Sequence, residues 1–215
     1  MIRFRLDQPP TSIVCVGAHP DDIEIGAAGA LVRCADWYPE AEFHFIILTG
    51  DGERRAEATL SAAALLGDHV TVHFGGFDDR FLPYRDAGAA KAFVASSVNA
   101  ESSDLVFAPH RDDLHQDHRF AADLVRQTFR HHPVFGYEIH KSEGDLGRPN
   151  FYVPLTAEQV EAKVGHLKAH FASQQSKPWY DGEAFQALMR IRGIESTTES
   201  GYAEAFHVGK IVLGD

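Results

Sequence analysis

The chain has 215 residues and a formal net charge of −11 at neutral pH. This length suits one domain with a single sizeable core, and a hydrophobic fraction of 44% is typical of a globular rather than a disordered protein. The acidic balance argues against nucleic acid and anionic membrane surfaces as partners, because both require a basic face. No run of about 18 apolar residues is present, so we expect no membrane span.

The two cysteines and the start of the chain indicate a reducing compartment. Cys15 lies in the first apolar run and Cys34 in the first expected helix, and neither has the CxxC spacing of a metal or redox motif. Residues 1–6 lack the apolar stretch of a signal peptide. We therefore expect reduced, packed cysteines and a cytoplasmic protein.

Strand-like and helix-like segments alternate through the first two thirds of the chain. The expected strands are residues 13–16, 42–49, 70–74, 104–108 and 134–140, and the expected helices are residues 26–32, 54–66 and 87–100 and a segment that ends at Phe129. A long irregular loop is expected at 75–85. This alternation predicts right-handed crossovers and a single α/β domain over residues 1–215, a Rossmann-like three-layer sandwich with a mainly parallel sheet.

The last third of the chain has a different pattern. Residues 142–150 form a polar loop, and residues 157–172 and 183–192 are expected to be helices. Residues 206–213 alternate between apolar and polar side chains and predict a closing strand that joins the edge region of the sheet.

The turn after the first strand carries His19, Asp21 and Asp22. In an open α/β sheet this turn lies at the carboxyl end of the strand, where such folds bind their ligands. Imidazole and carboxylate together suit zinc or a similar divalent ion. Because the two aspartates are neighbours, their side chains can point to different places, so that one binds a metal and the other faces a metal-bound water.

A second turn of the same kind follows the fourth strand. His115 and His118 are three residues apart at the start of a helix and share a face, and Asp117 can orient one imidazole through its second nitrogen. Three protein ligands from the two turns would leave an open position, as in catalytic zinc sites. The alternative is that the aspartates are helix N-caps and the histidines are loop residues, and two such turns at equivalent places in the fold favour the metal.

Residues 18–24 and 115–118 resemble the two signature motifs of the PIG-L/LmbE-like deacetylases. These are zinc-dependent N-deacetylases that act on N-acetylglucosaminyl compounds and related amino sugars. Weaker features of the family are found at residues 49–53, 66–67, 172–174 and 202–206, so the resemblance covers nearly the whole chain. It implies a hydrolase that removes an N-acetyl group from an amino sugar and releases acetate.

The resemblance implies one zinc ion per chain, with His19, Asp22 and His118 as its ligands. Asp21 would then be the general base that takes a proton from the zinc-bound water. Zinc lowers the pKa of bound water to about 7 and polarises a carbonyl oxygen, which agrees with this assignment.

The resemblance also implies that His115 faces the scissile amide and that Asp117 holds its ring. A protonated His115 could stabilise the oxyanion of the tetrahedral intermediate. The leaving amine needs a proton, and the sequence leaves Asp21 and His115 open as its donor.

Four further residues are candidate substrate contacts. The family has an arginine on the second helix, and the spacing to its neighbours selects either Arg54 or Arg55. Asp79 best matches a family aspartate that contacts the sugar, and His140 ends the fifth expected strand, where it would line the pocket. The alternative for Arg54, Arg55 and Asp79 is solvated surface charge.

Three other functions are alternatives to sugar deacetylation. A metal-dependent hydrolase of another amide or ester, and a non-catalytic metal-binding protein, would share the ligand set. A nucleotide-binding module is disfavoured, because residues 26–29 do not match GxGxxG and the carboxylates of the first turn would repel a pyrophosphate. The expected partner is a small acetylated amino sugar or sugar conjugate, and the sequence leaves open both the far end of this substrate and a homo-oligomer.

Overall fold

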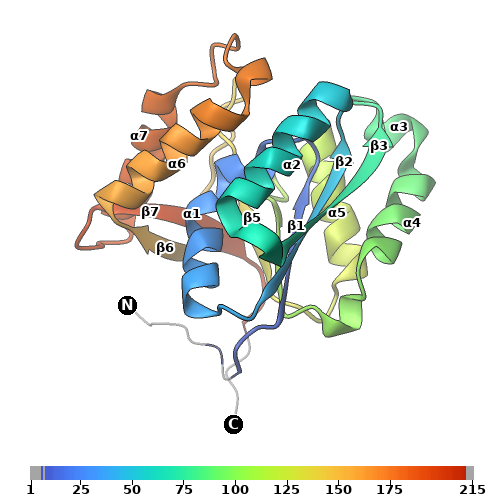
Figure 1. Cartoon of the computed structure of the whole chain (residues 1–215), viewed down its shortest axis with the longest axis horizontal. Helices are drawn as coiled ribbons and strands as arrows, with labels where there is room; N and C mark the ends of the chain where they lie inside the picture. The colour runs from blue at the N-terminus through green and yellow to red at the C-terminus, as the bar shows by residue number, and fades with distance from the viewer. Residues whose placement is uncertain (1–5, 7, 212–215) are drawn as a thin grey trace.

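The computed structural model describes residue 6 and residues 8–211. They contain a seven-stranded sheet in the order β3-β2-β1-β4-β5-β7-β6, with helices on both faces (Figure 1). The strands β3, β2, β1, β4 and β5 are parallel, whereas β7 runs antiparallel to both β5 and β6. The mainly parallel α/β fold expected from the sequence is therefore confirmed.

The strands are β1 (Ser12–Gly17), β2 (Glu42–Thr49), β3 (Val70–Phe77), β4 (Leu105–Pro109), β5 (Val134–Tyr137), β6 (Phe151–Leu155) and β7 (Tyr202–Val208). The α-helices are α1 (Asp22–Trp37), α2 (Gly52–Leu66), α3 (Leu82–Arg85), α4 (Ala87–Ser97), α5 (Gln116–Thr128), α6 (Ala157–His170) and α7 (Gly182–Glu195). Three short 3₁₀ turns are η1 (Gly67–His69), η2 (Ala100–Ser102) and η3 (Ala172–Gln174). Among the described residues, no helix is long and apolar enough to cross a membrane.

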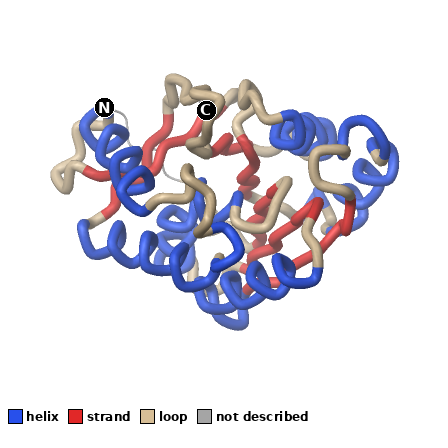
Figure 2. The backbone as a smooth tube through the Cα atoms, turned by 90° about the horizontal axis from the view of Figure 1, so that it is seen from above, coloured by secondary structure: helices blue, strands red, loops and turns tan. Residues whose placement is uncertain are grey.

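Both faces of the central strands are buried. Ile13 and Cys15 of β1 pack under α1, α2, α6 and α7, while Val14 and Val16 pack under α4 and α5. Figure 2 shows the helices on both sides of the strands from above. Cys15 and Cys34 are free and buried, as expected. The central strands are therefore fixed by two cores, which hold the turns at their carboxyl ends in place.

The first helix begins earlier than the sequence predicted. Asp21 has a φ of 112°, in the left-handed region, and α1 starts directly after it at Asp22. The turn between β1 and α1 is therefore short, and Asp22 lies in the first turn of the helix. The expected loop at 75–85 is also partly regular, since β3 continues to Phe77 and α3 begins at Leu82.

The closing strand joins the edge region of the sheet, as expected, but its predicted bounds were wrong. β7 spans Tyr202–Val208 and lies between β5 and β6, so it is one strand inside the edge. The sequence did not predict the edge strand β6, because it contains Pro154, and proline is tolerated in sheets mainly at edges. The expected end of the closing strand at residues 212–213 lies outside the described residues. β5 ends at Tyr137, so His140 follows the strand instead of ending it.

Candidate metal centre

The two histidine-rich turns meet at the carboxyl ends of β1 and β4. These strands are neighbours in the sheet. From β1 the chain continues to β2 and β3 on one side, and from β4 it continues to β5 on the other. This is the point at which the connections reverse direction, and open α/β sheets bind ligands in the crevice there. The sheet thus brings residues 19–22 and 113–118 together from distant parts of the sequence.

Two ring nitrogens and the two oxygens of one carboxylate form a compact group at this point. His19 Nδ1 lies 3.2 Å from His118 Nε2, and Asp22 places Oδ1 3.4 Å from His118 Nε2 and Oδ2 3.5 Å from His19 Nδ1. Ligands of a tetrahedral zinc ion, at 2.0–2.1 Å from the metal, are separated by about 3.3 Å. The three side chains are buried, so their donor set and spacing fit a four-coordinate ion with one remaining position. A ring nitrogen of His115 also lies within 4.8 Å of ring nitrogens of His19 and His118.

The charges of this group are strongly coupled. Burial would raise the pKa of the Asp22 carboxyl, but the neighbouring His118 and His19 hold it well below its usual value. Burial likewise lowers the pKa of His118, but the Asp22 carboxylate and a hydrogen bond to Asp113 raise it to about 9. Because metal ligands must be a neutral imidazole and an ionised carboxylate, a cation bound here would compete with protons for the His118 ring.

Each of the two histidines has a carboxylate on its other ring nitrogen. His118 Nδ1 lies 2.9 Å from Asp113 Oδ2, and His19 Nε2 lies 3.0 Å from Asp79 Oδ1 and 3.3 Å from Asp117 Oδ2. Such partners fix the tautomer and the ring orientation of metal-binding histidines. The nitrogens that face Asp22 are therefore the ones left free to bind an ion.

The Asp117 carboxylate contacts a different ring from the expected one. Its carboxylate lies on the His19 ring and accepts the backbone N–H of Arg80 (2.6 Å), whereas the ring of His115 accepts the backbone N–H of Asp117 at Nδ1 (3.2 Å). His115 is the N-cap of α5, and its ring stacks on that of His118 with centroids 4.5 Å apart. Burial, and then the charges of His118 and His19, lower the pKa of His115. His115 therefore faces the cluster as a largely neutral imidazole.

Asp21 points to a different place from Asp22, as the sequence predicted for this pair. Its Oδ1 accepts a hydrogen bond from Arg54 Nη2 (2.9 Å), and its Oδ2 is buried without a hydrogen-bond partner among the described residues. Burial, opposed by Arg54 and reinforced by Asp22, raises the pKa of Asp21 to about 7. A carboxylate with this pKa and one free oxygen suits proton transfer near neutral pH.

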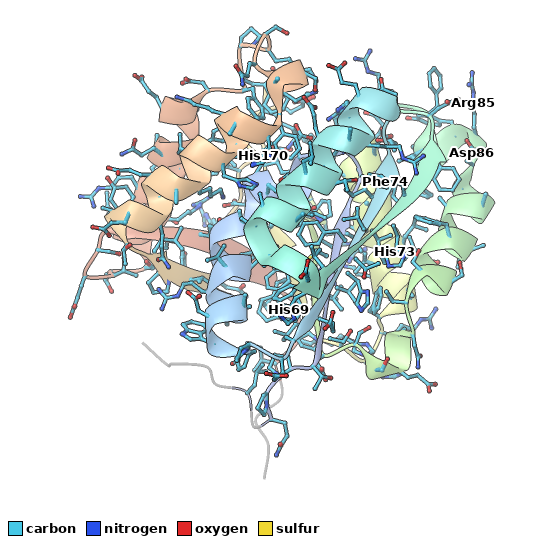
Figure 3. The ribbon with its side chains drawn as sticks, viewed as in Figure 1. His69, His73, Phe74, Arg85, Asp86 and His170 are labelled. Atoms are coloured by element: carbon cyan, nitrogen blue, oxygen red, sulfur yellow. The ribbon has the colours of Figure 1, made fainter. Side chains whose placement is uncertain are left out.

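The four candidate substrate contacts are divided by the structure. Arg54 and Asp79 lie at the cluster: Arg54 donates to Asp21, and Asp79 contacts the ring of His19. The guanidinium of Arg55 instead lies 4.7 Å from the ring centroid of Phe74. Phe74 is a residue of β3 and is labelled in Figure 3. His140 donates from Nε2 to the carbonyl oxygen of Trp179 (2.9 Å).

Sequence reasoning missed three residues that support the second turn. Asp113 holds His118, and Lys141 donates to both Asp113 and Asp145 at 2.8 Å. Asp113 is one of two neighbouring aspartates in a turn before a helix, a pattern that is typical of a helix N-cap. Lys141 follows β5, the neighbour of β4, so its place beside the second turn follows only once the strand order is known.

The chain is similar to known deacetylases. The sequence profile of the PIG-L family, described as GlcNAc-PI de-N-acetylase, matches residues 14–129, which include both turns. The uncharacterized deacetylase YaiS of Escherichia coli K12 is 28% identical over 169 residues, 74% of this chain and 89% of the relative. The diacetylchitobiose deacetylase of Thermococcus kodakarensis is 23% identical over 95% of this chain and 85% of its own.

A solved structure confirms the fold over almost the full length. The N,N'-diacetylchitobiose deacetylase from Pyrococcus horikoshii, complexed with an inhibitor, matches with a TM-score of 0.73 at 22% identity. The match covers 96% of this chain and 87% of that one. The described helices and strands thus form the architecture of that enzyme.

Proposed function

Because the chain belongs to the PIG-L family of de-N-acetylases, we propose that it is a metal-dependent hydrolase that removes the N-acetyl group of an amino sugar and releases acetate. The observation that carries the proposal is the group of two ring nitrogens and one carboxylate, joined by distances of 3.2–3.5 Å, beside a second carboxylate with a free oxygen. The donor set of two imidazoles and one carboxylate suits zinc. One divalent ion per chain would be held by His19, Asp22 and His118.

Zinc in this position would supply a Lewis acid that polarises the acetamide carbonyl and acidifies water. Asp21 accepts a proton at Oδ2 from the attacking water, because Arg54 occupies its other oxygen. A base whose pKa lies near the working pH can both take up a proton and give it away. Asp21 therefore also delivers the proton to the leaving amine.

His115 has a second role in this scheme. Its ring lies beside those of His118 and His19, with centroids 4.5 Å and 5.0 Å away, on the cluster that would bind the acetyl group. The neutral imidazole can donate a hydrogen bond to the oxygen that becomes negative in the transition state. The lowered pKa of His115 makes it a poorer carrier of the second proton than Asp21.

The substrate class is proposed from the relatives. Two of them are named for the deacetylation of diacetylchitobiose, an acetylated amino sugar. We infer that this chain acts on an N-acetylglucosaminyl-type conjugate.

The experiment is acetate release from a panel containing N-acetylglucosamine, N,N'-diacetylchitobiose, a non-sugar acetamide and an acetate ester. Each is tested with protein stripped of metal by a chelator and with the same protein reloaded with zinc. The proposal predicts acetate from an acetylated amino sugar only after reloading. Release from the non-sugar amide or the ester alone would favour the other hydrolase, and zinc binding without any release would indicate a metal-binding protein.

A further inference from the structure

Lys141 is a buried lysine in the loop after β5. Its side chain is 8% exposed, and its Nζ donates to Asp113 Oδ2 (2.8 Å), to Asp145 Oδ1 (2.8 Å) and to the carbonyl oxygen of Ile139 (3.1 Å). A buried ammonium is costly unless it is paired, and here three acceptors surround it. The three donors of Lys141 thus serve groups of the protein itself.

One of these acceptors also holds a candidate metal ligand. Asp113 Oδ2, which accepts from Lys141, is the same oxygen that contacts His118 Nδ1 at 2.9 Å. The other oxygen of Asp113 accepts the backbone N–H of His115 (2.7 Å). Because both oxygens are fixed, the Asp113 carboxylate has one orientation, in which His118 presents Nε2 to His19 and Asp22.

The second carboxylate on Lys141 belongs to another segment of the chain. Asp145 lies in the polar loop at 142–150, and its Oδ2 accepts the backbone N–H of Leu114 (2.6 Å), beside Asp113. Asp145 and Asp113 are both almost fully buried and face each other across one ammonium. Without Lys141 these two carboxylates would repel each other at short range, because solvent screens buried charges only weakly.

We propose that Lys141 is a positioning residue of the metal centre, which holds Asp113 on the ring of His118 against the charge of Asp145. The inference rests on the metal site proposed above and adds a residue outside both motif turns. In this arrangement Lys141 contacts neither the ion nor the substrate. It acts through Asp113 on the direction of the His118 ring, and so on the strength of metal binding.

The test is the zinc dissociation constant of the full chain, measured by competition with a chromophoric chelator, together with the melting temperature of the metal-free protein. Loss of an outer carboxylate contact typically weakens metal binding by about 10- to 100-fold, and we expect a loss of this size in Lys141→Met. The double variant Lys141→Met/Asp145→Asn should regain much of the affinity, because the repulsion on Asp113 is removed.

Lys163→Met is the matched control. Lys163 is equally buried, and its Nζ lies 2.6 Å from both Glu204 Oε1 and the carbonyl oxygen of Ile25. Its loss should lower the melting temperature but leave the zinc affinity at the wild-type value. Lys141→Gln, which can still donate to Asp113 but carries no charge, replaces Lys141→Met if that variant does not fold, and it should also bind zinc more weakly than wild type.

The outcomes separate the two proposals. Wild-type zinc affinity in the folded Lys141 variant would overturn the role of Lys141, and so would an equal loss of affinity in Lys163→Met, which would reflect general destabilisation. If the wild-type chain binds no divalent ion, the metal site itself is refuted and the role of Lys141 falls with it.

Discussion

Arg54 donates from Nη2 to Asp21 Oδ1 at 2.9 Å and to the carbonyl oxygen of Pro20 at 2.7 Å. One guanidinium nitrogen therefore holds both the candidate base and the backbone just before it. The family resemblance assigned an arginine on this helix to the substrate. The geometry gives Arg54 a role on the protein's own carboxylate, where its positive charge opposes the effect of burial on the pKa of Asp21.

We predict that Arg54→Met lowers kcat by about 10- to 100-fold with a smaller change in KM. A hydrogen bond to a charged group is worth about 1.5–3 kcal/mol, and each 1.36 kcal/mol is tenfold in rate. Arg55→Met is the control, because Arg55 is exposed and lies over Phe74. It should change kcat by less than about threefold. Steady-state kinetics on the acetylated sugar measures both, and a larger loss of kcat in Arg55→Met would exchange the two roles.

Asp117 and Asp79 both contact His19 Nε2 but differ in exposure. The Asp117 side chain is fully buried, while that of Asp79 is 46% exposed. An exposed hydrogen bond is readily replaced by water, so Asp117→Asn should weaken zinc binding by about 10- to 100-fold and Asp79→Asn by clearly less. Chelator competition measures both affinities. The reverse order would show that Asp79 is the main partner of His19.

The grouping of the three proposed metal ligands could be predicted because their position follows from the fold class. His19, Asp22 and His118 lie in turns after two strands, and parallel strands end at the same edge of a sheet. The outer carboxylates could not be assigned in the same way. Asp113 and Asp117 flank His115 at equal spacing in one turn, and only the rotation of α5 decides which of them reaches the ring of His118 and which reaches His19.

The strand order at the β6 end of the sheet also could not be predicted from the sequence. The alternating pattern at residues 206–213 overlaps β7 but does not show its neighbours, because pairing depends on residues far away in the sequence. Pro154 lowers the strand propensity of residues 151–155, so the edge strand β6 was not predicted. Both errors lie away from β1 and β4, so they left the candidate site unaffected.

Gly26→Ala should destabilise the protein by about 1–3 kcal/mol, because a Cβ at this position in α1 would overlap the buried ring of Tyr137. Gly165→Ala in α6 is the matched change, since a Cβ there meets nothing within 4 Å. It should stabilise by about 0.5–1 kcal/mol through helix propensity. Urea unfolding of the two variants measures both effects. Equal effects would contradict the packing of α1 on Tyr137.

Glu138→Gln should destabilise the protein by an amount that depends on pH. Arg192 binds both oxygens of the buried Glu138 carboxylate, at 2.7 Å and 2.8 Å. Although burial raises the pKa of Glu138, hydrogen bonds from His207 and Arg192 bring it below the usual value of 4.5. Breaking such a pair costs about 3–5 kcal/mol.

The direction of the pH effect follows from the lowered pKa. The wild-type advantage is fully present above the unfolded value near 4.5 and is lost as the pH falls through the lower folded value. The unfolding free energies of wild type and Glu138→Gln should therefore differ most near pH 7 and approach each other as the pH falls below the unfolded value near 4.5. Glu40→Gln, at an exposed position, should show no such difference. A constant gap at all pH values would contradict the ion pair.

The central claim is tested most directly by measuring zinc content and acetate release together in Asp21→Asn and Asp22→Asn. Asp21→Asn keeps the size of the side chain but is a poor base, so it should bind zinc as wild type does and lose about 10²- to 10⁴-fold in kcat. Asp22→Asn removes a ligand charge between His19 and His118, so it should lose zinc first. If Asp21→Asn loses zinc while Asp22→Asn keeps it, the two roles are exchanged. If Asp21→Asn retains zinc and full activity, Asp21 is not the base and the account is contradicted.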